Sequence, residues 1–77
     1  MTVKEFCEQL ADLIEVEEEL SLHSNLKDFE EYDSLAIMSL VAFIHKNFGK
    51  QFNARQLNQV DTVESLVELI GKESFTD

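Results

Sequence analysis

The sequence contains no proline and no tryptophan, and only two glycines and one cysteine among its 77 residues. Strands and hairpins are usually separated by turn residues such as proline and glycine, so their scarcity favours a helical chain. The lone Cys7 cannot form an internal disulfide and no segment resembles a signal peptide, which together predict a reducing, cytoplasmic location. We also expect no membrane insertion, because no apolar run approaches the roughly 20 residues that span a bilayer.

Basic residues are scarce as well, since six Lys and Arg stand against 16 Asp and Glu, for a net charge of −10. Phosphate binding requires a basic stripe, so nucleic acid is excluded as a ligand and partners with basic surfaces are favoured. Residues 1–33, 34–60 and 61–77 have net charges of −9, +3 and −4. The acidic residues therefore flank the middle segment of the chain in sequence and are absent from it.

The chain is also short. A chain of 77 residues forms one domain with a small core, which disfavours an independent enzyme. A hydrophobic content of 44% is nevertheless enough for folding. We expect a single monomeric domain over residues 1–77.

Apolar spacing in the first half predicts a helix over residues 2–14, with Thr2 as its cap and Glu5 completing a capping box. Residues 15–33 are acidic and sparsely apolar, and predict a long, ordered loop. Its expected anchors to the core are Leu20, Leu22, Leu26 and Phe29.

A second helix is predicted over residues 34–48, ending before Gly49, with His45 and Lys46 at its negative C-terminal end. Its expected core stripe consists of Ile37, Leu40, Val41, Ile44 and Phe48. Leu35, Met38 and Phe43 point away from this stripe. They either pack against other parts of a small bundle or form a surface on which a partner protein docks.

Two further elements complete the predicted fold. A short helix is expected over residues 54–59, capped by Asn53. A last helix over residues 62–70 is expected to open with Asp61 and Glu64 in capping-box spacing, and residues 71–77 are expected to form a frayed tail. The fold class is thus all-α, a small bundle of three long helices and one short helix.

Ser34 stands at the predicted start of the second helix, in the triplet Asp33-Ser34-Leu35. Its simplest interpretation is a helix N-cap, because Ser and Asp both accept hydrogen bonds from backbone N–H groups there. A chemical interpretation uses the same position. The positive helix end favours a phosphate attached to the hydroxyl, and the carboxylate of Asp33 can help to hold a divalent cation during phosphoryl transfer.

The whole chain resembles an acyl carrier protein. The resemblance rests on DSL followed by a helix that ends in FG within DSLAIMSLVAFIHKNFG, and on the pattern TVxxLVxxI within DTVESLVELI. The short helix near FNARQL and the acidic, helical character of the chain agree with it. The fold that it implies is the acyl-carrier bundle with a long loop between the first and second helices.

The resemblance also implies a function. Ser34 would receive 4'-phosphopantetheine from coenzyme A through a phosphopantetheinyl transferase, and Asp33 would assist this modification. The distal thiol would carry an acyl group as a thioester between acyl-activating and acyl-transferring enzymes, so the chain would be a carrier and not an enzyme. Leu35 and Met38 match positions that meet partner enzymes.

The chain departs from the family's fatty-acid members along the second helix. Those members have acidic residues there, whereas this chain has Ala36, Ser39, His45, Lys46 and Asn47. This predicts a specialised carrier with dedicated partners rather than the carrier of bulk fatty-acid synthesis. Tyr32 replaces the small residue often found ahead of the DSL triplet, and is expected to pack over the helix start or to lie beside the arm.

Two alternatives stay open. The chain could be an aminoacyl carrier of the same fold, or an unmodified acidic adaptor that binds a partner through Leu35, Met38 and Phe43. An enzyme that uses the carboxylates is disfavoured by size. No metal site is predicted, because Cys7 lies on an apolar stripe and no Cys or His stands at metal-ligand spacing.

Overall fold

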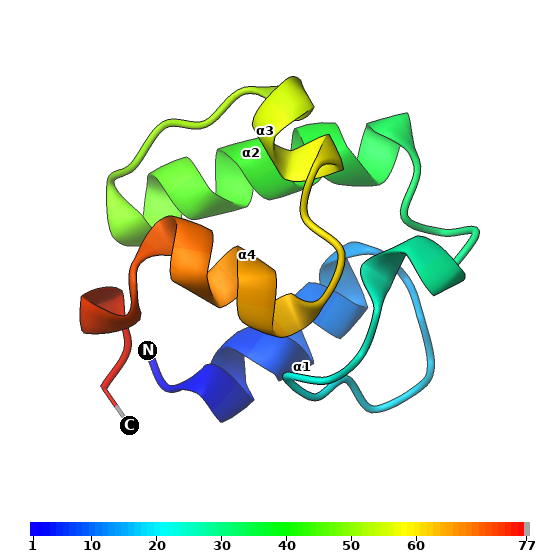
Figure 1. The fold of residues 1–77 in the computed structure, drawn as a ribbon, viewed down its shortest axis with the longest axis horizontal. Coiled ribbons are helices and arrows are strands. Elements are labelled where there is room, and N and C mark those ends of the chain that lie inside the picture. Colours follow the sequence, from blue (N-terminus) through cyan, green and yellow to red (C-terminus); the bar gives the residue numbers. More distant parts are fainter. Residues whose placement is uncertain (77) are drawn as a thin grey trace.

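The computed structural model describes residues 1–76, which form four α-helices and two short 3₁₀-helices and no strand (Figure 1). The α-helices are α1 (Val3–Leu13), α2 (Ser34–Phe48), α3 (Ala54–Asn58) and α4 (Val63–Ile70). The 3₁₀-helices are η1 (Leu26–Asp28) and η2 (Lys72–Ser74). The predicted all-α bundle of three long helices and one short helix is therefore confirmed.

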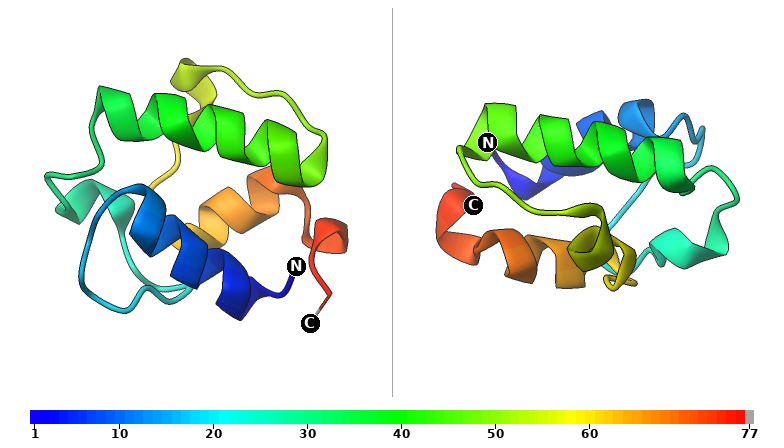
Figure 2. Two further views of the ribbon diagram at one scale, coloured as in Figure 1. Left: turned by 180° about the vertical axis from the view of Figure 1, so that it is seen from behind. Right: turned by 90° about the horizontal axis from the view of Figure 1, so that it is seen from above.

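Helix α2 lies along one side of the molecule, opposite α1 and α4, and α3 packs against it (Figures 1 and 2). The beginning of the chain and the end of its described part lie side by side in both figures. There the backbone N–H of Thr76 donates a hydrogen bond of 3.1 Å to the carbonyl oxygen of Met1. The start of α2 and the adjacent α3 lie at the surface of the molecule.

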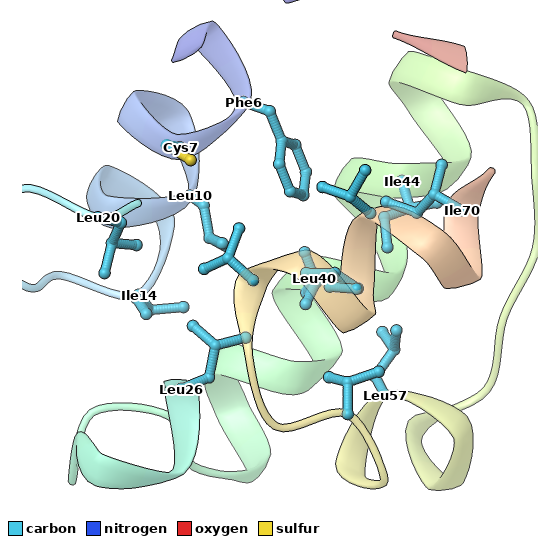
Figure 3. Close-up of a cluster of buried hydrophobic side chains, with 14 of the residues drawn as sticks. Phe6, Cys7, Leu10, Ile14, Leu20, Leu26, Leu40, Ile44, Leu57 and Ile70 are labelled. Atoms are coloured by element: carbon cyan, nitrogen blue, oxygen red, sulfur yellow. The ribbon is translucent and has the colours of Figure 1, made fainter. Parts of the chain in front are cut away.

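The core is entirely apolar within the described chain, and every long helix contributes to it (Figure 3). Phe6 and Leu10 extend from α1, Leu40 and Ile44 from α2, and Ile70 from α4, and all five are fully buried. Cys7 is buried beside them. Burial of such side chains, at about 1.5–3 kcal/mol each, supplies the main stabilisation of a bundle this small.

Helix α1 begins and ends with defined backbone hydrogen bonds. Thr2 caps it in the predicted capping box with Glu5. After its last turn Glu15 has a φ of 59°, in the left-handed region that glycine normally occupies. The N–H groups of Glu15 and Val16 donate to the carbonyl oxygens of Asp12 and Ala11, which completes a Schellman motif.

The loop between α1 and α2 is held by its side chains and its backbone. Leu20 and Leu26 are buried, and Leu22 and Phe29 pack against the core. The carbonyl oxygens of Leu22 and Ser24 accept hydrogen bonds of 3.0 Å from the first free N–H groups of α4. Because these N–H groups have no partner within their own helix, the loop completes the N-terminus of α4.

The predicted cap of the last helix is wrong by one residue. Thr62, not Asp61, is the N-cap, and its hydroxyl accepts from the N–H of Ser65 at 3.1 Å. Asp61 instead accepts from the N–H of Thr62 at 2.7 Å, and this bond holds the pKa of its carboxyl below the usual range. Asp and Thr are both common N-cap residues, so the sequence Asp61-Thr62 does not by itself show which of the two caps the helix.

The predicted frayed tail over residues 71–77 is also wrong for the part that the structure describes, while Asp77 lies outside it. Residues 72–74 form η2, and Phe75 is buried. Its ring lies 5.3 Å from that of Phe6 and 5.2 Å from that of Phe48, between ring centroids. Aromatic contacts at these distances fix the end of the chain to the core.

Candidate functional site

The start of α2 is built by Asp33. Its backbone is extended, and its Oδ1 accepts a hydrogen bond of 3.0 Å from the N–H of Ala36. Its carbonyl oxygen accepts from the N–H of Ile37 at 2.9 Å. Asp33 is therefore the N-cap, and Ser34 is the first residue of a 15-residue helix.

This geometry corrects the interpretation of Ser34 as a helix cap. The capping position is occupied by Asp33, so the hydroxyl of Ser34 is not needed there. Ser34 is exposed, and within residues 1–76 its hydroxyl has no hydrogen-bond partner. An exposed hydroxyl at the positive end of a long helix is available for attachment of a phosphate.

Two of the three apolar residues expected to point outward do so. Leu35 is 78% exposed and Met38 is 60% exposed, and they are the exposed large hydrophobic residues of the described chain. For Phe43 the structure agrees with the other alternative, packing within the bundle, because its side chain is partly buried against the core and its ring centroid lies 6.1 Å from that of Phe6. The exposed apolar surface is thus confined to the first half of α2, beside Ser34.

Tyr32 links the loop before Asp33 to α3 and to the core. Its hydroxyl donates a hydrogen bond of 2.7 Å to the carbonyl oxygen of Leu57 in α3, and its ring packs against the core. Partial burial raises the pKa of Tyr32 to about 12, because the phenolate would lose hydration. This residue fixes the loop before Asp33 relative to α3.

Two grooves flank the start of α2. One has a volume of about 290 Å³ and is lined by Ser34, Ile37 and Met38 of α2 and by Ala54, Arg55 and Asn58 of α3. We call it the α2–α3 groove. The other, of about 410 Å³, lies on the α1 side and its lining includes three carboxylates. We call it the acidic groove, and those carboxylates belong to Glu15, Glu31 and Asp33.

Arg55 is a site residue that the sequence did not reveal. It reaches the neighbourhood of Ser34 only because α3 packs against α2. The nearest sequence signal was the positive net charge of residues 34–60, which does not say which cation lies beside Ser34.

A larger groove, of about 830 Å³, lies between α1 and the loop that follows it. It is lined by acidic residues such as Glu8 and Glu17 and shares no residue with the two grooves at Ser34. Over residues 1–76 no group of three or more His, Cys, Asp or Glu side chains is arranged to hold a metal ion. The start of α2, with the exposed side chains of Asp33 and Ser34, therefore remains the candidate functional site.

Comparisons with known proteins match nearly the whole chain. Residues 4–70 match the family described as "Phosphopantetheine attachment site". The chain is 34% identical to an acyl carrier protein of Coprothermobacter proteolyticus over 68 residues, which is 87% of this chain and 83% of that protein. No solved structure shows a significant match. In the described part of the chain, no helix has the length and apolar character needed to cross a membrane.

Proposed function

We propose that this chain, which belongs to the acyl carrier protein family, carries its covalent 4'-phosphopantetheine on Ser34. The observation that supports this most directly is the exposed, unbonded hydroxyl of Ser34 at the start of α2, in a chain matched to a phosphopantetheine attachment family. When bound, the cofactor supplies a thiol that holds an acyl group as a thioester. The protein's part is to present this arm to enzymes.

The residues around Ser34 fit such a group. The hydroxyl opens to the surface, so a phosphodiester formed there needs no buried volume. The free N–H groups in the first turn of α2 provide a favourable field for the phosphate. Because Asp33 fixes the helix start through Ala36, Ser34 can be modified without loss of the cap.

Asp33 has a second proposed role. One carboxylate oxygen accepts from Ala36, while the side chain as a whole stays exposed. An exposed carboxylate next to the attacking hydroxyl can help to bind the divalent cation that phosphoryl transfer requires. We therefore expect Asp33 to assist the phosphopantetheinyl transferase.

Leu35 and Met38 are the proposed docking residues for the transferase and for acyl-transferring enzymes. They are the exposed large hydrophobic residues of the described chain and lie within two turns of Ser34. Phe43 is not proposed as a docking residue, because its side chain packs against the core. Exposed apolar side chains next to an attachment site favour a protein partner.

The carrier is further proposed to be specialised. Residues 34–60, which include all of α2 and α3, contain no Asp or Glu. A partner surface that relies on basic residues would find no carboxylate there, so dedicated enzymes with a different docking surface are expected. The monomeric state and the cytoplasmic location remain predictions.

The test is the intact mass of the protein before and after incubation with coenzyme A, Mg²⁺ and a promiscuous phosphopantetheinyl transferase. We expect the wild type to gain one phosphopantetheine and Ser34→Ala to gain none. Ser39→Ala is the matched control, because Ser39 is an exposed serine on the same helix and its variant should be modified like the wild type. A folded wild type that gains no mass would reject the attachment and favour an unmodified adaptor.

A further inference from the structure

The two grooves beside Ser34 differ in charge. Ser34 itself lines the α2–α3 groove, together with Arg55 and Asn58, and no acidic residue lines that groove. Its neighbours Asp33 and Leu35 line the acidic groove instead. A group attached to the hydroxyl of Ser34 therefore begins on the side of the molecule that holds a cation.

Arg55 is the cation available on that side. Its side chain is exposed, and it forms no ion pair within residues 1–76. Lys50 is engaged at the far end of α4, where its Nζ donates to the carbonyl oxygen of Ile70 and lies 3.5 Å from Oε1 of Glu73. Lys46 lies in the last turn of α2, about 18 Å along the helix from Ser34 at 1.5 Å per residue.

We propose that Arg55 donates hydrogen bonds from its guanidinium to the phosphate of the group on Ser34, and thereby holds the start of the arm in the α2–α3 groove. Arginine suits this role because its planar N–H donors match two phosphate oxygens at once. On the other side of α2 the three carboxylates of the acidic groove repel the same phosphate. Attraction and repulsion thus direct the arm toward α3.

This inference rests on the proposed attachment at Ser34, and it adds a residue that positions the arm. The attached group would leave Ser34 in the groove that Met38 and Arg55 also line. Met38 is one of the two proposed docking residues, so a partner that covers it would also contact the part of the arm nearest to Ser34. The electrostatic contact is exposed, and it should weaken as salt is added.

The experiment uses the full chain loaded with phosphopantetheine, with loading checked by intact mass. The readouts are the ³¹P transverse relaxation rate of the phosphodiester and the NMR signal of the Arg55 Nε–H group. We expect the Arg55 signal to shift on loading of the wild type and to move back as salt is added. Arg55→Gln should lower the ³¹P relaxation rate toward that of free phosphopantetheine. Lys46→Gln, which removes the same charge far from Ser34, should leave the rate unchanged.

Arg55 is exposed, so its replacement should leave folding intact, which circular dichroism will check. Equal ³¹P relaxation rates in the loaded wild type and in loaded Arg55→Gln, without a shift of the Arg55 signal, would overturn this inference alone. A wild type that gains no phosphopantetheine would overturn the attachment at Ser34 and this inference with it.

Discussion

The hydroxyl of Tyr32 donates a hydrogen bond of 2.7 Å to the backbone carbonyl oxygen of Leu57. Leu57 lies in the last turn of α3, where carbonyl groups have no partner within the helix. Tyr32 therefore satisfies one end of α3 while it holds the loop that leads to Asp33 and Ser34. This link connects the loop before Ser34 to the helix that forms one wall of the α2–α3 groove.

Tyr32→Phe should lower the free energy of unfolding at neutral pH by about 0.5–1.5 kcal/mol, the usual net contribution of one hydrogen bond. The pKa of Tyr32 is about 12 in the folded protein, above its ordinary value of 10.0. A raised pKa in the folded state means that its contribution to stability is complete below pH 10 and is lost as the pH rises toward 12. Denaturant unfolding at several pH values will measure this loss.

The chain has a single tyrosine and no tryptophan, so the phenolate absorbance reports on Tyr32 alone. Tyr32→Phe is the matched control for the alkaline range, since it removes the titrating hydroxyl and keeps the ring. An absorbance midpoint at the ordinary tyrosine value, together with parallel stability curves for the two proteins, would contradict the prediction.

Glu15→Gly should stabilise the protein. Glu15 is the non-glycine residue with a positive φ in the described chain, at 59°. A left-handed conformation costs a side-chain-bearing residue on the order of 1 kcal/mol, and glycine adopts it without that cost. We expect the free energy of unfolding to rise by up to about 1 kcal/mol in denaturant titrations. Glu17→Gly removes the same charge nearby without relieving a positive φ, so a similar gain there would show that charge, not conformation, is responsible.

Asp33→Ala and Ser34→Ala should separate the two roles at the start of α2. Loss of the cap should make Asp33→Ala less stable by about 1 kcal/mol. Ser34→Ala should change stability by less than about 0.5 kcal/mol, since its hydroxyl has no partner in the described structure. Thermal unfolding will compare them, and equal losses would show that the two side chains share the capping role.

The helices were largely predictable from the sequence. The spacing of Phe6, Leu10 and Ile14 marks one face of α1, and Gly49 marks the end of α2 with a φ of 68°. Local signals of this kind depend only on residues close in sequence, so they can be recognised without knowledge of the tertiary structure.

The features that were missed depend on contacts between distant segments. Phe75 looked like part of a polar tail, and only its position against Phe6 and Phe48 explains its burial. Phe43 looked exposed on a helical wheel, but the packing of α1 covers it through Phe6. Arg55 lies beside Ser34 through the contact of α3 with α2. None of these contacts has a periodic signature in the sequence.

The docking role of Leu35 and Met38 gives the sharpest functional prediction. Both side chains are exposed, so their truncation should leave the free energy of unfolding within about 0.5 kcal/mol of the wild type. A partner that buries a leucine or methionine gains about 1.5–3 kcal/mol from it. Leu35→Ala combined with Met38→Ala should therefore slow modification of Ser34 by at least about tenfold at subsaturating carrier concentration. The rate of mass gain measures this effect.

Two control variants distinguish docking from folding. Lys46→Ala truncates an exposed side chain at the other end of α2, and its modification rate should match that of the wild type. Phe43→Ala removes a ring that contacts Phe6, so it should lose stability rather than docking, by roughly 3 kcal/mol if the site does not collapse. If the double variant is modified as fast as the wild type by the transferase, Leu35 and Met38 do not form its docking surface, and their exposure would have to serve another partner.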